Sequence, residues 1–331
     1  MSCRKGNGDL GAVKALPIFA PMGRLRTVTM VTFLAWSATP ASSHAQNAAV
    51  NGLRDRIGAR VARVGGAEVA VSFRDLAGGD SLDIGANVDF HAASTMKIPV
   101  MLEVLRATEA GRLALDQPIL LVNHFHSIVD GSPYALDPSE DSDSTVYTMV
   151  GRRVAVRDLL GRMIVRSSNL ATNALISLVG AEQANATAHA LGATHIRVLR
   201  GVEDGKAYAA GLNNTTTSAD LAVLLARIER GDALSGPNAR LMKDILLRQE
   251  FNDEIPAGLP PGTPVAHKTG SITATLHDAA IVYPPGRAPY VLVVLTRKIP
   301  EEATARTLIA DVSRLVWAHA TGPSIATMRA Q

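Results

Sequence analysis

The stretch FHAASTMKIPVM, residues 90–101, joins a turn-rich segment to an apolar run and places a serine three residues ahead of a lysine. If a helix begins near Ser94, Lys97 lies on the same face one turn later, with the two Cβ atoms about 5–6 Å apart. Such a pair is either a nucleophile beside its base or a helix cap beside a solvated charge. The rest of the chain has to distinguish these two interpretations.

The chemistry of this pair depends on whether the lysine is buried. Unpaired backbone N–H groups at a helix start can stabilise negative charge near Ser94. Lys97 can accept a proton only as a neutral amine, and burial favours that form by lowering the lysine pKa. The flanking AAS and IPVM segments are apolar enough to bury it. Because Ser-x-x-Lys also arises by chance, the motif needs support from elsewhere.

The order of strands and helices around this stretch predicts an α+β fold. Residues 67–76 and 81–90 alternate around an AGGD turn and predict a β-hairpin. Two more apolar runs flank a Pro-Pro-Gly-Arg turn within residues 277–298, and a final helix follows. Between them, residues 95–255 read mainly as helices, one of them with Ser218 as its N-cap. We therefore expect an antiparallel sheet formed by both chain ends, flanking terminal helices and an inserted all-helical lobe.

The expected sheet lobe comprises about residues 46–93 and 262–331, and the helical lobe about residues 94–261. A cleft between two such lobes is the natural place for a site. The longest irregular segment, residues 123–148, is acidic and contains proline. We expect it to be a loop that borders the cleft, and the alternative is a flexible flap with no role.

The first 45 residues read as a leader that is removed on export. Arg24 and Arg26 precede an apolar run too short to span a membrane comfortably, and Ser43 and Ala45 supply the small residues that a signal peptidase requires. We expect cleavage after Ala45, no stable membrane insertion afterwards, and a periplasmic or secreted product. The alternative is an uncut membrane anchor.

Composition excludes several classes of protein. The chain has 331 residues, of which 47% are hydrophobic and 19% charged, as in globular proteins. Without the leader, 28 basic and 29 acidic residues remain, so no nucleic-acid partner is expected. The single cysteine, Cys3, lies in the leader, which leaves no disulfide and no Cys-ligated metal. His124 and His126 form a His-x-His pair without a third ligand, so we expect no metal. A monomer is the default.

Two further clusters follow the first in the chain. Ser167-Ser168-Asn169 stands ahead of an apolar helical run, and Lys268-Thr269-Gly270 begins the penultimate strand. Together with Ser94-Thr95-Met96-Lys97, these residues resemble the serine β-lactamase and penicillin-binding-protein superfamily, most closely the class A β-lactamases. That family has Ser-x-x-Lys, Ser-Asp-Asn and Lys-Thr-Gly in this order. The resemblance covers essentially the whole chain after the leader.

The resemblance implies a role for each residue of the first two motifs. Ser94 would attack a carbonyl carbon and become acylated, and Lys97 would help to activate it. Ser167 would relay a proton to the departing amine, while Asn169 would hold the substrate amide. Physically, this is a nucleophile with a base and a proton shuttle.

The resemblance also implies how the substrate is bound. Lys268 and Thr269 would bind its carboxylate, next to Gly270 in the same motif. The oxyanion hole would consist of the backbone N–H of Ser94 and that of a residue on the Lys268 strand, for which we expect Ser271. The implied substrate is a β-lactam or a cell-wall peptide, and no cofactor is implied.

This sequence departs from the family pattern at two places before the third motif. Ser168 stands where the family has aspartate, a position that mainly shapes the loop. The gap between the first two motifs is also longer than usual, because it includes residues 123–148.

A third departure concerns hydrolysis of the acyl-enzyme. Class A enzymes use a glutamate followed at short range by Leu-Asn. Here Leu212-Asn213 stands nine residues after Glu203, the only glutamate in this region, with Asp204 beside it. We expect Glu203 to be the deacylating base, which would contribute about 10²–10⁴-fold. The alternative is an exposed acid that pairs with Arg200 or Lys206.

We therefore predict a class A-like β-lactamase that acts through an acyl-enzyme at Ser94. A D-Ala-D-Ala peptidase or esterase of the same fold is the alternative, favoured if Glu203 lies away from Ser94. A binding module that senses β-lactams or cell-wall peptides without turnover is the third hypothesis.

Overall fold

Five antiparallel strands form the central sheet of the protein. The structure, a computed structural model, describes residues 40–77 and 79–322. The strand order is β2-β1-β11-β10-β9, and the strands are β1 (Glu68–Asp75), β2 (Ser81–Ile84), β9 (Val265–Ile272), β10 (Thr275–Val282) and β11 (Tyr290–Arg297). Strand β1 pairs along its whole length with β11, with Glu68 opposite Arg297. The predicted sheet built from both chain ends is therefore confirmed.

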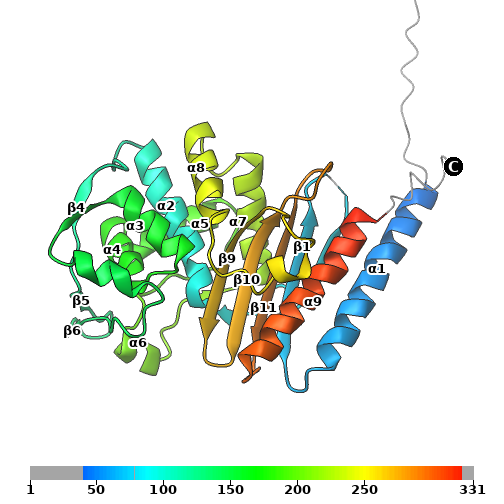
Figure 1. The fold of residues 1–331 in the computed structure, drawn as a ribbon, viewed down its shortest axis with the longest axis horizontal. Helices are drawn as coiled ribbons and strands as arrows, with labels where there is room; N and C mark the ends of the chain where they lie inside the picture. The colour runs from blue at the N-terminus through cyan, green and yellow to red at the C-terminus, as the bar shows by residue number, and fades with distance from the viewer. Residues whose placement is uncertain (1–39, 78, 323–331) are drawn as a thin grey trace, which may run out of the picture. The chain divides into compact units, whose positions relative to one another are not determined.

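Two long helices cover one face of this sheet. Helices α1 (Pro40–Ala62) and α9 (Glu302–Thr321) lie side by side in Figure 1, as predicted for the flanking terminal helices. Their apolar faces share one core with the sheet residues that point the same way, including Leu53, Ile57, Leu292, Leu308 and Val312.

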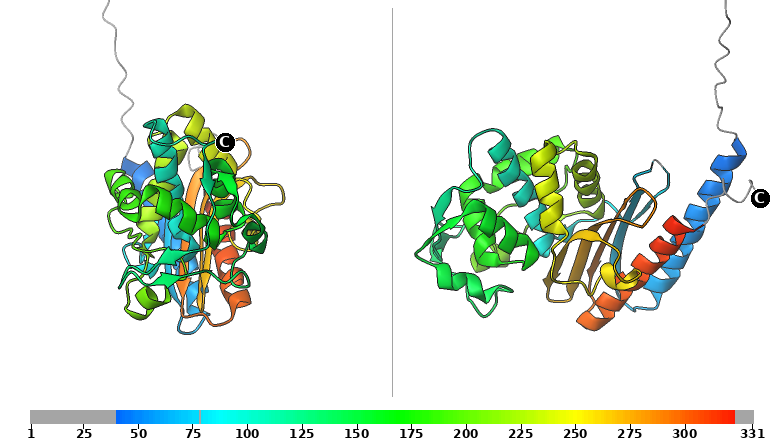
Figure 2. Two further views of the ribbon diagram at one scale, coloured as in Figure 1. Left: turned by 90° about the vertical axis from the view of Figure 1, so that its left-hand side faces the viewer. Right: turned by 45° about the horizontal axis from the view of Figure 1, so that its top comes forward.

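The opposite face of the sheet carries the helical lobe. Its helices are α2 (Lys97–Glu109), α3 (Val156–Val165), α4 (Asn169–Val179), α5 (Ala181–Ala190), α6 (Gly205–Ala209), α7 (Ser218–Arg230) and α8 (Gly236–Leu246). Helix α7 packs on β1, β10 and β11, and Figure 2 shows the terminal helices, the sheet and the helical lobe in succession.

Helix α2 is the central helix of that lobe. It is covered on all sides, since ten of its 13 residues are buried. An apolar helix with no solvent-facing stripe is typical of a core helix. This environment matters for function because Lys97 is the first residue of α2.

Several local details differ from the sequence predictions. The second hairpin strand ends at Ile84 instead of residue 90, and Phe90–His91 (β3) pairs with Thr215–Thr216 (β8). The N-cap of α7 is Thr217, whose hydroxyl accepts a hydrogen bond from the Asp220 N–H, so the prediction of Ser218 was wrong by one residue.

Residues 123–148 fold against the helical lobe. The strand pair β4 (Pro118–Leu120) and β7 (Arg153–Ala155) brackets the segment. Within it lie β5 (Phe125–His126), β6 (Pro133–Tyr134) and most of a 3₁₀ helix, η2 (Ser144–Met149). Another short 3₁₀ helix, η3 (Pro256–Gly258), contacts α9.

The predicted leader, residues 1–45, lies outside the described residues except where α1 begins at Pro40. Among the helices of residues 40–77 and 79–322, none is both long and apolar enough to cross a membrane.

Candidate active site

Ser94 lies in a 3₁₀ turn, η1 (Ala93–Met96), immediately before α2. The sequence predicted a helix starting near this residue, and the tight turn differs from that expectation only in its hydrogen bonding. The turn packs against the edge strand β9. A Cβ atom on Gly270 would come within 3.0 Å of Ser94 N and 3.1 Å of Thr95 N. A side chain at this position would force the strand or the turn to shift, so the Lys-Thr-Gly strand and the serine turn are closely packed against each other.

Lys97 is completely buried and points at the second motif. Its Nζ donates hydrogen bonds to Ser167 O at 2.6 Å, Ser167 Oγ at 3.1 Å and Asn169 Oδ1 at 3.0 Å. Burial lowers the pKa of Lys97 well below its usual value, and the positive charge of Lys268 lowers it further. Such an amine readily loses a proton, which leaves a lone pair for a hydroxyl proton.

The backbone between α3 and α4 presents the second motif to this amine. Ser167 has a φ of +58°, a conformation that a non-glycine residue rarely adopts. The residue is buried, and both its carbonyl and its hydroxyl face Lys97. Ser168 is the N-cap of α4, and its hydroxyl accepts a hydrogen bond from the Ala171 N–H. The unusual backbone at Ser167 is thus tied to its position in the site.

Asn169 connects Lys97 to Glu203. Its Oδ1 accepts from Lys97, and its Nδ2 donates to Glu203 Oε1 at 2.9 Å. The hydrogen bonds to Lys97 and to Glu203 therefore require the same orientation of the Asn169 side-chain amide. Glu203 has a φ of +63°, and its Oε2 accepts from the Asp137 N–H at 3.3 Å. The structure thus brings Glu203 into the group of predicted site residues.

The alternative role for Glu203, a surface ion pair, is not found among the described residues. Arg200 donates to the carbonyl oxygens of Leu212 and Gly201 and to Asn213 Oδ1. Lys206 pairs with Asp130 at 2.7 Å.

The neighbouring carboxylate, Asp204, has a structural role instead. It caps α6 through the Ala207 N–H and accepts from Ser127 Oγ and the Ile128 N–H. Of the two adjacent acids, only Glu203 contacts the motif residues.

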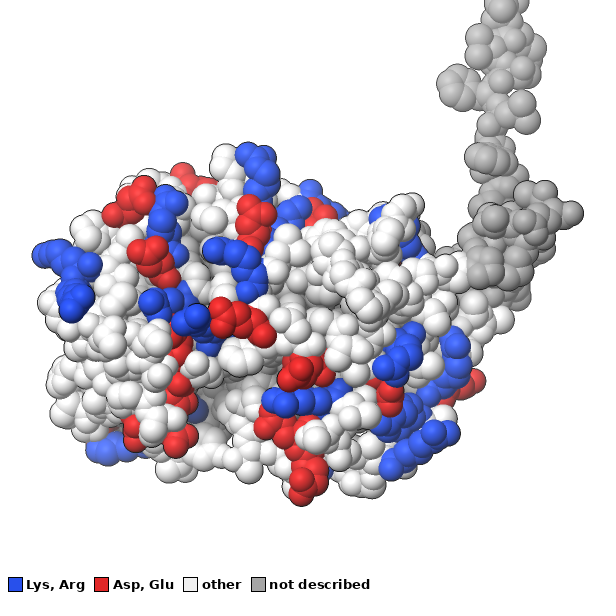
Figure 3. Space-filling model, in the orientation of Figure 1, with Lys and Arg blue, Asp and Glu red and all other residues white. Residues whose placement is uncertain are grey.

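Lys268 lies inside the protein on β9, two residues before Gly270. It is completely buried, and its Nζ donates to Thr269 O at 2.9 Å. Burial lowers the pKa of Lys268 to about 7, an effect that Asp278 and Glu254 oppose. On the face shown in Figure 3, acidic and basic side chains are interspersed.

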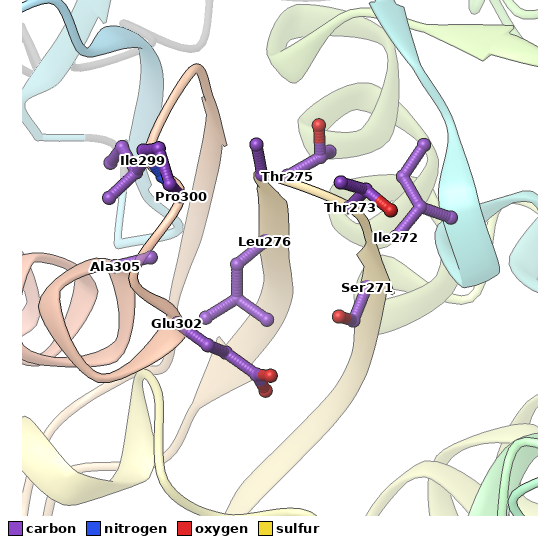
Figure 4. A pocket seen from close by; sticks show the side chains of 10 residues that line it. Ser271, Ile272, Thr273, Thr275, Leu276, Ile299, Pro300, Glu302 and Ala305 are labelled. Carbon is purple, nitrogen blue, oxygen red and sulfur yellow. The ribbon is translucent and has the colours of Figure 1, made fainter.

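Ser271 is exposed on β9 and borders a cleft of about 330 Å³. Figure 4 shows this cleft between the β9–β10 turn and the start of α9, with Leu276, Ile299 and Glu302 around it. Its lining includes neither Ser94 nor Lys97, and Ser271 is the predicted site residue that borders it.

One residue of the site was missed by the sequence interpretation. Asp141, in the acidic segment between β6 and η2, has a buried carboxylate that contacts the start of α4. The available signals were the aspartate missing at position 168 and the Asp-Ser-Asp run at residues 141–143, but neither shows that the two segments meet.

The sequence predicts no metal at the His-x-His pair, His124 and His126. Their rings lie edge to face, 5.0 Å apart, and the residues described by the structure contain no group of three or more His, Cys, Asp or Glu arranged to hold a metal ion.

This fold and this arrangement of motifs define a protein of the serine β-lactamase and penicillin-binding-protein superfamily, as predicted. A family model described as the β-lactamase enzyme family matches residues 52–320, and the chain belongs to that family. The β-lactamase AST-1 of Nocardia asteroides is 30% identical over 256 residues, which cover 76% of this chain and 78% of that protein.

Solved structures agree with the sequence relatives. A β-lactamase from Sphaerobacter thermophilus superposes with a TM-score of 0.71 at 26% identity, covering 82% of this chain and 97% of the other. A mutant of PBP-A, solved as an acyl-enzyme complex with penicillin G, has a TM-score of 0.69 at 28% identity, with coverage of 81% and 96%. The comparisons support an enzyme with class A-like β-lactamase function.

Proposed function

We propose that the protein hydrolyses the amide bond of β-lactams through an acyl-enzyme at Ser94, with Glu203 as the base that releases it. The observation that carries the proposal is the chain of hydrogen bonds from Lys97 through Asn169 to Glu203. It places a buried amine and a carboxylate on the two sides of one amide, beside the turn that bears Ser94.

Acylation requires a neutral amine next to the nucleophile. Ser94 Oγ forms a bond to the lactam carbonyl carbon while its proton passes to Lys97. The backbone N–H groups of Ser94 and Ser271 stabilise the oxyanion. The ring C–N bond then breaks, and Ser167, which contacts Lys97 Nζ at 3.1 Å, delivers the proton to the leaving nitrogen. Lys268 and Thr269 hold the substrate carboxylate during these steps.

Deacylation requires a base that can activate water. Glu203 takes a proton from water as the water attacks the ester carbon, and the proton returns to Ser94 Oγ when the ester C–O bond breaks. The free enzyme and a ring-opened acid result. Leu212-Asn213 does not follow Glu203 closely, so Asn169 is the amide that holds this carboxylate.

The two alternative functions differ from this proposal in the fate of the acyl-enzyme. A D-Ala-D-Ala peptidase or esterase is favoured if Glu203 lies away from Ser94, whereas here the carboxylate contacts Asn169, the same side chain that Lys97 contacts. A sensor would retain the acyl group, for which a positioned carboxylate base has no use.

The test is hydrolysis of a chromogenic cephalosporin by the wild type and by Glu203→Gln. Steady turnover in the wild type should become a burst of about one equivalent in the variant, with the acyl group retained on Ser94 in mass spectrometry. Glu140→Gln, which changes an exposed glutamate of the acidic segment, is the matched control and should turn over normally. A burst in the wild type itself would instead favour the peptidase or sensor.

Export through a cleaved leader is part of the same proposal, because cell-wall-directed β-lactams act outside the cytoplasm. The support is the small-residue pattern ending at Ala45. The mass of the protein recovered from a periplasmic fraction tests it, since cleavage after Ala45 predicts an N-terminus at Gln46.

A further inference from the structure

The carboxylate of Asp141 is the most heavily hydrogen-bonded group near the site that the mechanism above does not use. It is buried, and its Oδ2 accepts from the N–H groups of Asn169 and Leu170, each at 2.9 Å. The same oxygen receives the hydroxyls of Ser168 at 3.3 Å and Tyr147 at 3.2 Å. One oxygen atom from the acidic segment therefore gathers donors from the motif and from η2.

These contacts satisfy the start of α4 in two complementary ways. The first N–H groups of a helix have no partner within the helix and favour a negative charge nearby. Ser168 Oγ takes the N–H of Ala171, while Asp141 takes those of Asn169 and Leu170. An ionised acceptor makes stronger hydrogen bonds than a neutral one. The carboxylate of Asp141 thus joins the acidic segment to the start of α4.

We propose that Asp141 is a positioning residue for acyl transfer, which holds the Ser167–Asn169 loop in the register that Lys97 requires. The inference rests on the proposed function. It assigns to the acidic segment the carboxylate that the motif lacks at Ser168: the charge is supplied from a different part of the chain.

The geometry links this carboxylate directly to the reacting groups. Asn169 uses its backbone N–H for Asp141 and its side chain for Lys97 and Glu203. Ser167, three residues before Leu170, has the strained φ of +58° and contacts Lys97 through two atoms. A displacement of about 1 Å in such a loop can cost ~10²-fold in rate. Loss of the Asp141 charge would therefore affect both partners of Lys97.

A second buried carboxylate, that of Asp143, also anchors the acidic segment. Asp143 accepts from Arg162 at 2.6 Å and lies 3.6 Å from Arg166. Among the described residues, its buried carboxylate makes no hydrogen bond or ion pair with α4. Asp143 is consequently a matched control that loosens the same segment without removing the carboxylate at the motif.

The pH dependence of acylation tests the charge of Asp141 separately from its packing. The charged groups that act on Lys97 are Lys268, which lowers its pKa, and Asp141 and Glu203, which raise it. Replacing Asp141 by asparagine removes a negative charge, so the pKa of Lys97 should fall further. Since the neutral amine is the active form, the acidic limb of the acylation rate should move to lower pH.

The experiment compares four proteins: the wild type, Asp141→Asn, Asp141→Asn combined with Ser168→Asp, and Asp143→Asn. Acylation of Ser94 by a fluorescent penicillin is followed by rapid quench across pH, because labelling does not require turnover. Asp141→Asn should slow acylation about 10–10²-fold and shift its acidic limb downward. The double variant, which returns a carboxylate to the motif, should recover at least tenfold. Asp143→Asn should lower the melting temperature but slow acylation less than threefold.

Equal acylation rates in the wild type and Asp141→Asn would overturn the inference, as would a double variant no faster than the single one. If the wild type is not labelled at all, the proposed function fails, and the inference is then decided by amide hydrogen exchange without substrate. Amide exchange at Asn169 and Leu170 should accelerate in Asp141→Asn and return to the wild-type rate in the double variant. Unchanged exchange would contradict the positioning role.

Discussion

Lys268 illustrates how burial sets the chemistry of a single residue. The side chain is fully enclosed, and the loss of hydration lowers its pKa to about 7 although Asp278 and Glu254 favour the charged form. A lysine in this state is only about half protonated at neutral pH. Because only the ammonium form attracts a carboxylate, the ability of Lys268 to bind an anionic substrate should be present below its pKa and lost above it.

This predicts an alkaline limb in kcat/KM, which reports the free enzyme. For a carboxylate-bearing β-lactam, kcat/KM should fall as pH rises through about 7, by up to about tenfold per pH unit. Lys268→Arg should remove the limb because arginine stays charged. The neutral ester of the same β-lactam is the control and should show no such limb. A limb of equal size with the ester would assign the titration to another group.

At the scale of elements, the sequence predicts what lies within one run of residues but not how separate runs meet. The three motifs could be recognised from the sequence because each is a run of adjacent residues. The contact between Asp141 and Asn169 spans 28 positions and depends on how the acidic segment folds, so no local pattern could reveal it. The position of Glu203 depends similarly on a backbone φ of +63°. The N-cap of α7 shifted by one residue because Thr217 and Ser218 are both good caps.

The close approach of β9 to η1 makes Gly270→Ala a test of how the two elements meet. The added Cβ would lie 3.0 Å from Ser94 N and 3.2 Å from Ala93 Cβ, so strand or turn has to move. We expect acylation to slow about 10–10²-fold, with a stability loss of about 1–3 kcal/mol from overpacking. Gly161→Ala, where the new Cβ meets nothing within 4 Å, is the control and should leave acylation unchanged. Unaltered acylation in Gly270→Ala would mean that the contact is looser than the structure shows.

At the scale of the whole molecule, the end of the helical lobe, the β9–β10 hairpin and helix α9 meet in a polar cluster near Lys268. His267 and Asp278 lie side by side on β9 and β10, with His267 Nδ1 and Asp278 Oδ1 3.0 Å apart. Glu254 lies nearby in the segment that leads to η3, 3.7 Å from Arg306 of α9. The order of elements in the sequence predicts that the helical lobe and the terminal helix meet the sheet. It does not indicate this cluster, because its members come from three separate segments whose contact no local pattern reveals.

Glu254 should make the stability of the whole protein depend on pH. Burial, together with the charge of Asp278, raises its pKa to about 8, well above the ordinary value of 4.5. Between these two pH values the folded protein holds a proton that the unfolded chain releases, so stability falls as pH rises toward 8 and the carboxylate has to ionise inside. Glu254→Gln, which is always neutral, should therefore raise the melting temperature at pH 8.5–9 and have little effect near pH 5. Glu301→Gln changes an exposed glutamate at the N-cap of α9 that makes no side-chain capping hydrogen bond, and it should change neither value. If Glu254→Gln destabilised the protein equally at both pH values, the Arg306 contact would outweigh the cost of ionisation, and Glu254 would join α9 as an ion pair instead of as a protonated acid.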